Sequence, residues 1–389
     1  MAVLYNFGNV LTDENELAEK AHIGKLRQFV NAAMHGDEKS IEFRHGRVTT
    51  KDLSDNSKLD LPDFTQPEIG KPLSVEILSV YTGDAPQKFF GGKKDLLVVS
   101  GAKAFNTFGR APRAINQLVQ KVEDNQYLQP GAFTQGSPIV YYTPAVDIST
   151  TFCSFELVAD SFNREIFDVI GRLFSSAAGL PIFAPISGYL LVGGALVKTA
   201  GKLSSAIFET APFLREDIAF RFETPGVPIL QAKQMVICND RDKQEFMAYQ
   251  PGLTTEVSGA KRPVLIHRQT QKPYRGNAPY LMISVDGRKR DALKEFTPKL
   301  ASAAMIEKFY GSSLEVQEMD ILEQAMLLFN DFHYYQKAKE LEQSLMSLDG
   351  STLDSNSEDF RKATKLLNAY VNNIRNEVFR ADLSVIDLL

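Results

Sequence analysis

Eight short apolar runs, most of them with polar residues at every second position, constrain the fold of this 389-residue chain more than any other feature. A period of two places successive side chains on opposite faces of a strand, which is typical of a sheet with one buried face. Gly, Pro and Asn separate the runs, which favours antiparallel strands over β–α–β units. We predict strands at 73–77, 96–99, 139–142, 153–160, 217–223, 235–238, 264–267 and 281–285.

The remaining pattern predicts helices at both ends of the chain and inside the strand-rich region. The predicted class is α+β, with an antiparallel β-sandwich core, a helical insert, an N-terminal helix and a C-terminal helical hairpin. The predicted domains are an N-terminal helix and short strand at 1–50, a polar linker at 51–72, the sandwich at 73–296 with its insert at 161–213, and an acidic helical domain at 297–389.

The insert contains an unusual segment, Leu173–Val197, which has 25 residues and no charge. About 20 apolar residues suffice to cross a bilayer, but Pro181 and Pro185 would break a single helix. We therefore predict two packed helices on the sheet, the second running from Gly188 towards Phe208, with Ile170, Leu173 and Phe174 buried. A membrane-active hairpin and a permanent transmembrane helix are the alternatives. The apolar insert residues of interest are Ile170, Leu173, Phe174, Ile182, Phe183, Leu190 and Leu191.

Charge is distributed unevenly along the second half of the chain. Residues 257–290 carry eight basic side chains against the single acid Asp286, whereas residues 315–359 carry eleven acids against Lys337 and Lys339. The basic segment predicts a surface for an anionic partner, and the acidic helices could mask it until proteolysis within 348–359 releases them. The candidate partner-binding residues are Lys261, Arg262, Arg268, Lys272, Arg275, Arg288, Lys289 and Arg290.

No motif in the sequence specifies a reaction. The five histidines lack metal-ligand spacing, and a calcium-loop pattern beginning at Asp52 has Ser57 where glycine is needed. Gly194, Gly201 and Lys202 do not have P-loop spacing. Cys153 and Cys238 lie in apolar strands and are expected to be buried, unreactive thiols. We therefore predict no catalytic residue, no metal and no cofactor.

These observations favour a non-catalytic cytosolic effector or adaptor that works through its basic β-domain face and its apolar insert. One alternative is a membrane-active effector that binds or perturbs lipid after proteolytic release, and the other is a hydrolase whose site one sequence does not show. The expected partner is a protein or an anionic membrane surface. Nucleic acid is less favoured, because only Tyr274 and Tyr280 accompany the basic residues. Two cysteines and an acidic N-terminus without a signal-peptide pattern predict a cytoplasmic protein, with peripheral membrane association left open.

Overall fold

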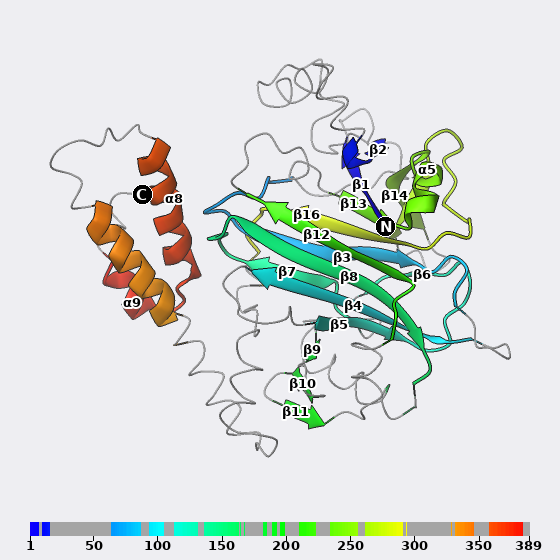
Figure 1. The fold of residues 1–389 in the computed structure, drawn as a ribbon, viewed down its shortest axis with the longest axis horizontal. Helices are drawn as coiled ribbons and strands as arrows, with labels where there is room; N and C mark the ends of the chain where they lie inside the picture. The colour runs from blue at the N-terminus through cyan, green and yellow to red at the C-terminus, as the bar shows by residue number, and fades with distance from the viewer. Residues whose placement is uncertain are drawn as a thin grey trace.

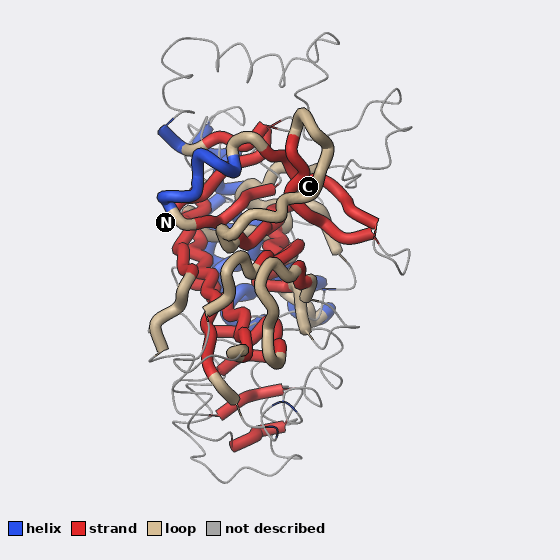
Figure 2. The backbone as a smooth tube through the Cα atoms, turned by 90° about the vertical axis from the view of Figure 1, so that its right-hand side faces the viewer, coloured by secondary structure: helices blue, strands red, loops and turns tan. Residues whose placement is uncertain are grey.

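The structure is a computed structural model, and it shows an α+β protein built on antiparallel sheets (Figure 1). Figure 2, at right angles to the first view, shows that strands are the main regular element of the described chain. The structure describes residues 1–7, 10–15, 64–86, 93–104, 113–130, 136–162, 164, 167, 182–184, 189–192, 195–198, 210–222, 234–255, 261–290, 293, 328, 331–345 and 358–383.

The first sheet has seven strands, and its centre joins segments that are far apart in the sequence. Its order is β2-β1-β13-β16-β3-β6, with β7 also paired to β3, and every pair is antiparallel. The strands are β1 (Ala2–Phe7), β2 (Val10–Thr12), β3 (Leu73–Tyr81), β6 (Tyr127–Leu128), β7 (Ile139–Thr143), β13 (Gln234–Cys238) and β16 (Tyr280–Asp286).

The second sheet also has seven strands, in the order β11-β10-β9-β5-β4-β8-β12. Its three central strands, β5, β4 and β8, are long, and β12 pairs with β8 along its whole length. The strands are β4 (Asp95–Ala104), β5 (Arg113–Val119), β8 (Thr150–Asp160), β9 (Ile182–Ala184), β10 (Tyr189–Val192), β11 (Ala195–Lys198) and β12 (Leu214–Arg221).

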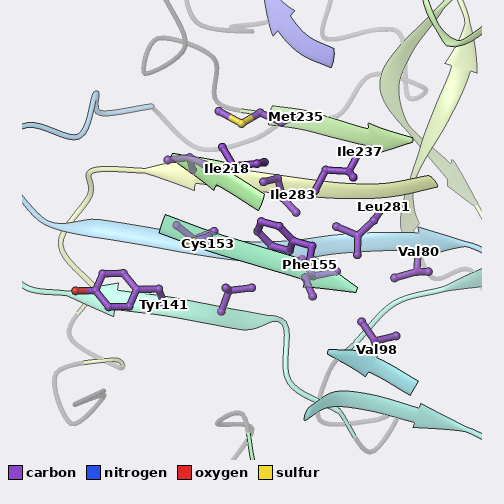
Figure 3. Packing of buried hydrophobic residues seen from close by; sticks show 14 of the residues in the cluster. Val80, Val98, Tyr141, Cys153, Phe155, Ile218, Met235, Ile237, Leu281 and Ile283 are labelled. Carbon is purple, nitrogen blue, oxygen red and sulfur yellow. The ribbon is translucent and has the colours of Figure 1, made fainter. Parts of the chain in front are cut away.

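One hydrophobic core lies between the two sheets. Alternate residues of β8 enter it, namely Cys153, Phe155 and Leu157, because a strand turns every second side chain to the same face. From the first sheet, Met235 and Ile283 enter the same cluster, and Figure 3 shows side chains of both sheets pointing towards one another. This shared core fixes which face of each sheet points inward.

The outer face of the first sheet is covered over half of its length by a third layer. That layer consists of a two-stranded hairpin, β14 (Tyr249–Thr255) and β15 (Lys261–His267), preceded by η5 (Asp240–Asp242) and α5 (Lys243–Phe246). Leu265 and Phe246 from this layer belong to one buried cluster with Leu4, Val236 and Met282 of the sheet. Because both faces of the sheet are covered, every residue of β13 and β16 is buried.

The C-terminal helices have a small core of their own. A helix over 331–345 packs against α8 (Glu358–Asn373), and α9 (Glu377–Ala381) follows; Ala338, Leu367 and Ile374 form the centre of their contact. Asp331 accepts hydrogen bonds from the backbone N–H groups of Arg375 and Asn376, so it caps the turn between α8 and α9.

All eight predicted strands are confirmed: seven fall within β3, β4, β7, β8, β13, β15 and β16, and the one predicted at 217–223 overlaps β12, which ends at Arg221. The predicted second helix of the insert is wrong, because β10 and β11 occupy 189–198 as an antiparallel pair. Val192 pairs with Ala195, which leaves Gly193 and Gly194 between the strands, and Gly-Gly is a favoured two-residue hairpin connection. This turn signal was missed when the run was interpreted as helical.

Several predictions fall on residues outside the described part of the chain. They are the N-terminal helix beyond residue 15, most of the linker, the burial of Ile170, Leu173 and Phe174, and the loop at 348–359. Among the helices that the structure describes, none is long and apolar enough to cross a membrane.

Two phenylalanines of β8 provide a test of the shared core. Phe155 is fully buried between the sheets, whereas Phe152, on the opposite face, is 41% exposed. We expect Phe155→Ala to lower the free energy of unfolding by about 3–5 kcal/mol and Phe152→Ala to change it by about 0.5 kcal/mol or less. Urea denaturation measures both values, and equal effects of the two substitutions would contradict the assigned inner face.

Candidate functional site

The structure divides the predicted basic residues into two groups. Lys261, Arg262, Arg268, Lys272 and Arg275 lie on β15 and on the segment that follows it, whereas Arg288, Lys289 and Arg290 follow β16. The intervening β16 extends over six residue steps, which corresponds to about 20 Å. The eight residues therefore do not form one continuous surface, and each group has its own surroundings.

The first group, which we call the hairpin cations, comprises Lys261, Arg268, Lys272 and Arg275. All four side chains are exposed. Within the described part of the chain, no carboxylate forms an ion pair with any of them. The described carboxylates therefore do not compensate their charge.

The arginines of this region are held in place by uncharged groups. Arg262 Nη1 donates a hydrogen bond to the carbonyl of Tyr127 (2.6 Å), and Arg268 Nη2 donates to the carbonyl of Met247 (2.8 Å). The guanidinium of Arg275 lies 5.2 Å from the centroid of the Tyr127 ring, a cation–π arrangement. The contacts of Arg268 and Arg275 orient their guanidinium groups without neutralising them.

A cluster of aromatic rings supports the hairpin from below. Tyr81 lies 4.7 Å from Tyr127, 5.2 Å from Tyr274 and 5.4 Å from Tyr280, measured between ring centroids. Burial raises the pKa of Tyr127 to about 12, although Arg275 opposes the rise. Tyr127 therefore keeps its proton at neutral pH, and its hydroxyl donates a hydrogen bond to the carbonyl oxygen of Tyr274. The segment that carries the hairpin cations is therefore packed against a cluster of buried aromatic rings.

The second basic group differs, because two of its arginines are paired with buried carboxylates. Arg288 Nε lies 2.6 Å from Asp286 Oδ2, and Arg290 Nη1 forms an ion pair with Glu76 Oε1. The side chains that carry these carboxylates are only 5% exposed for Asp286 and 12% for Glu76, whereas Lys289 is exposed. Arg288 and Arg290 thus compensate buried charge within the protein, which is a structural role that the sequence did not indicate.

Polar residues also line the outer face of the first sheet next to this second group. Asn6, Gln234, Ser284 and Glu76 lie on four neighbouring strands, β1, β13, β16 and β3, and successive members are directly paired or hydrogen-bonded. The alternation of Glu76 with apolar residues predicts a solvent-facing position, but Glu76 is buried in the structure. We call these four residues the polar row; their exposed fractions are 7%, 4%, 8% and 9%.

The predicted apolar insert residues are only partly located. Ile182 and Phe183 belong to β9, and Leu190 and Leu191 belong to β10, at the edge of the second sheet. The structure therefore places them in strands and not in the predicted helices. Ile170, Leu173 and Phe174 lie outside the described residues.

Both cysteine thiols are buried, as predicted. Burial raises the pKa of Cys238 to about 12 and shifts that of Cys153 further in the same direction. Such thiols stay protonated at neutral pH and are poor nucleophiles. Among the described residues, no group of three or more His, Cys, Asp or Glu side chains is arranged to hold a metal ion.

The C-terminal helices contact the sheets through polar groups. Asn373 of α8 donates to the carbonyl of Ala145 (2.8 Å) and accepts from the hydroxyl of Thr143 (3.2 Å). Asp147 interacts with Tyr334 and Lys337 of the helix over 331–345. In this part of the interface the carboxylate belongs to the sheet side and the lysine to the helix side. Figure 1 shows the helices at the opposite end of the sheets from α5 and β14.

No protein-family model, curated protein or solved structure matches this chain. The assignment of function therefore depends on the geometry described above.

The ion pairs of the second basic group yield a stability prediction. Arg290→Ser would leave Glu76 without its guanidinium partner, so we expect a loss of about 1–3 kcal/mol in the free energy of unfolding. Lys272→Ser removes an exposed cation and should change it by about 0.5 kcal/mol or less. Chemical denaturation of the two variants measures the difference, and an undisturbed Arg290→Ser variant would show that the pair has no structural role.

Asp147 yields a prediction about pH. Burial raises its pKa above the ordinary value of 3.8, with Lys337 opposing the rise. The folded state therefore favours the protonated form, so this contribution to stability is fully present below the ordinary pKa and is lost as pH rises through the raised pKa. His333, whose pKa burial lowers, titrates with the opposite sign.

Asp147→Asn removes the titration of the aspartate and also the attraction by which Asp147 raises the pKa of His333, so comparison with this variant reports on the aspartate together with its coupling to His333. We expect the stability of the wild type to fall relative to the variant as pH rises from 4 to 7. Thermal unfolding across this range measures the difference. Parallel curves for the two proteins would mean that Asp147 does not change its surroundings on folding.

Proposed function

We propose that this protein is a non-catalytic binding module, an effector or adaptor, that engages an acidic partner through the hairpin cations. The single observation that carries the proposal is that Lys261, Arg268, Lys272 and Arg275 are exposed and have no carboxylate partner among the described residues. The two sheets with their common core support the predicted β-sandwich architecture, and they would serve as the scaffold.

The fixed orientation of the arginines favours a role in binding a partner over a role in keeping the protein in solution. An arginine already held by a carbonyl or a ring loses less side-chain freedom on binding than a free one. Arginine also offers two parallel donors to a carboxylate or phosphate. The surroundings of Arg268 and Arg275 therefore suit them to contribute strongly to affinity.

The partner that these features favour is an acidic protein surface. Of the large apolar residues exposed in the described part of the chain, namely Met1, Phe152, Leu328, Phe332 and Val378, none lies on the hairpin. Insertion into a bilayer usually requires such side chains beside the basic ones. Charge attraction alone could still bring the hairpin to an anionic membrane, so the membrane reading is retained as the second candidate.

The masking of this surface by the acidic helices stays a prediction. The described contacts of those helices lie at Thr143, Ala145 and Asp147, and the hairpin lies at the other end of the sheets in Figure 1. We therefore propose that the hairpin cations are accessible in the intact protein, without prior proteolysis.

A charge-matched pair of variants tests the proposal. In the first, Lys261, Arg268, Lys272 and Arg275 are changed to serine; in the second, four exposed cations elsewhere are changed, namely Arg221, Arg241, Arg361 and Lys365. Retention on immobilised polyglutamate should fall at least tenfold for the first variant and little for the second. Binding by the wild type should weaken steeply with salt, since exposed charges are screened within about 8 Å at physiological ionic strength.

Vesicles of phosphatidylcholine with and without phosphatidylserine distinguish the two candidates. Co-sedimentation with the anionic vesicles but no retention on polyglutamate would favour the membrane partner. If both serine variants lost retention on polyglutamate equally, binding would depend only on net charge. This result would overturn the assignment of the binding surface to the hairpin cations.

A further inference from the structure

Strand β12 forms one edge of the second sheet. It is the last strand in the order of that sheet and pairs with β8 along its whole length (Figure 1). Just beyond the strand, the N–H group of Phe222 donates to the carbonyl of Ser149, so the even-numbered residues direct their backbone groups towards β8. The residues whose backbone groups point to the outer edge are Arg215, Asp217, Ala219 and Arg221.

No other strand occupies this outer edge among the described residues. No backbone group of another described segment is hydrogen-bonded there, and the amide of Asp217 interacts only with the neighbouring carboxylate of Glu216. An edge of this kind can add a strand from another chain. The question is which strand its side chains would accept.

The side chains along the edge are charged, and their signs differ. Arg215, Asp217 and Arg221 are all exposed. Arg215 Nη2 lies 3.4 Å from Asp217 Oδ2, but the Asp217 side chain remains 57% exposed. Arg221 forms no ion pair with a carboxylate of the described chain. Charges of a single sign would repel a second copy of this edge, whereas mixed signs allow it to approach.

The order of the charges makes the edge complementary to itself. When two copies of β12 pair in antiparallel fashion about a two-fold axis at Ala219, Asp217 of one copy lies opposite Arg221 of the other, and symmetry forms this pair twice. Each facing pair of outward residues exchanges two backbone hydrogen bonds. On the inner face, Ile218 of one copy lies opposite Phe220 of the other.

The neighbouring registers bring like charges together. A two-fold axis at Glu216 or at Asp217 places two carboxylates directly opposite each other, and an axis at Ile218 places Arg215 opposite Arg221. Like charges in directly opposed positions destabilise a strand pair. Of these four registers, only the one centred on Ala219 joins opposite charges without such repulsion.

An exposed aromatic ring lies beside the same centre. Phe152 of β8 is the cross-strand partner of Ala219 and is 41% exposed, although it belongs to a central part of the sheet. Cross-strand partners share one face of a sheet. In the paired arrangement, the Phe152 rings of the two copies flank the two central alanines and lose part of their exposure to water, which favours association.

From this arrangement we propose that two copies of the chain associate through β12, so that their second sheets continue as one sheet across the interface. The occupant of the edge is therefore a second copy of this chain. A contact that uses the same patch on both copies closes on itself and gives a dimer, not a fibre. The hairpin cations belong to the layer on the first sheet, so this proposal is independent of the proposed function.

Charge reversal tests the proposal, with sedimentation velocity over a series of protein concentrations as the measurement. Asp217→Arg and Arg221→Asp should each weaken self-association at least tenfold, because each creates two like-charge pairs. The double variant should associate as the wild type does. An equimolar mixture of the two single variants should form a heterodimer, because every cation then faces an anion. The two reversals change the net charge in opposite directions, so weakening by both cannot result from overall charge.

Two exposed charges on η5 supply the controls. Asp240→Arg and Arg241→Asp make the same changes in charge away from the edge and should leave self-association unchanged. Because Arg221 is also a control position in the polyglutamate test, that test is run below the concentration at which the chain self-associates.

The proposal is overturned if the wild type stays monomeric over its whole soluble range. It is also overturned if the wild type dimerises but the single reversals dimerise equally well, since the interface then lies elsewhere. Failure of the mixed single variants to form a heterodimer would refute the register centred on Ala219.

Discussion

The covering of the first sheet on both of its faces is the constraint on which the rest of this structure depends. The second sheet packs on the inner face, and the hairpin with α5 packs on half of the outer face. A central strand in this position must be apolar almost throughout, and every residue of β16 is buried. The same arrangement holds the hairpin cations above a fixed aromatic base, because Tyr274 and Tyr280 anchor the hairpin to the sheet.

Sequence periodicity located the strands well because it depends on local geometry. The alternation of Cys153, Phe155 and Leu157 is produced by any strand with one buried face, so it could be read without knowledge of the partner sheet. Periodicity could not reveal a second cover on the outer face: the alternation of Ser74 and Glu76 with apolar residues predicts solvent-facing positions, but both residues are buried. In the insert, apolar content obscured a hairpin that Gly193 and Gly194 indicate.

Charge along the sequence has the same limitation: it does not show which basic residues share a surface. Eight basic residues within 34 positions suggested one surface, but β16 separates them by its own length and two of them neutralise Asp286 and Glu76. Pairing between distant positions, such as Arg290 with Glu76, depends on the order of strands in the sheet. The polar row depends on it even more, since Asn6 and Gln234 meet across 228 positions of sequence.

The long separation between paired strands has a consequence for synthesis of the chain. β1 can pair early with β2, and β3 with β6 and β7, but the partners on their other edges are β13 and β16, so one edge of each strand stays unpaired until late in synthesis. The first sheet is completed only when β16 emerges, after about seven-tenths of the chain has been made. At typical rates of about 5–20 residues per second, β1 and β3 spend many seconds with unpaired edges and exposed apolar side chains. Nascent chains of this protein should therefore depend on chaperones that bind extended apolar segments during translation.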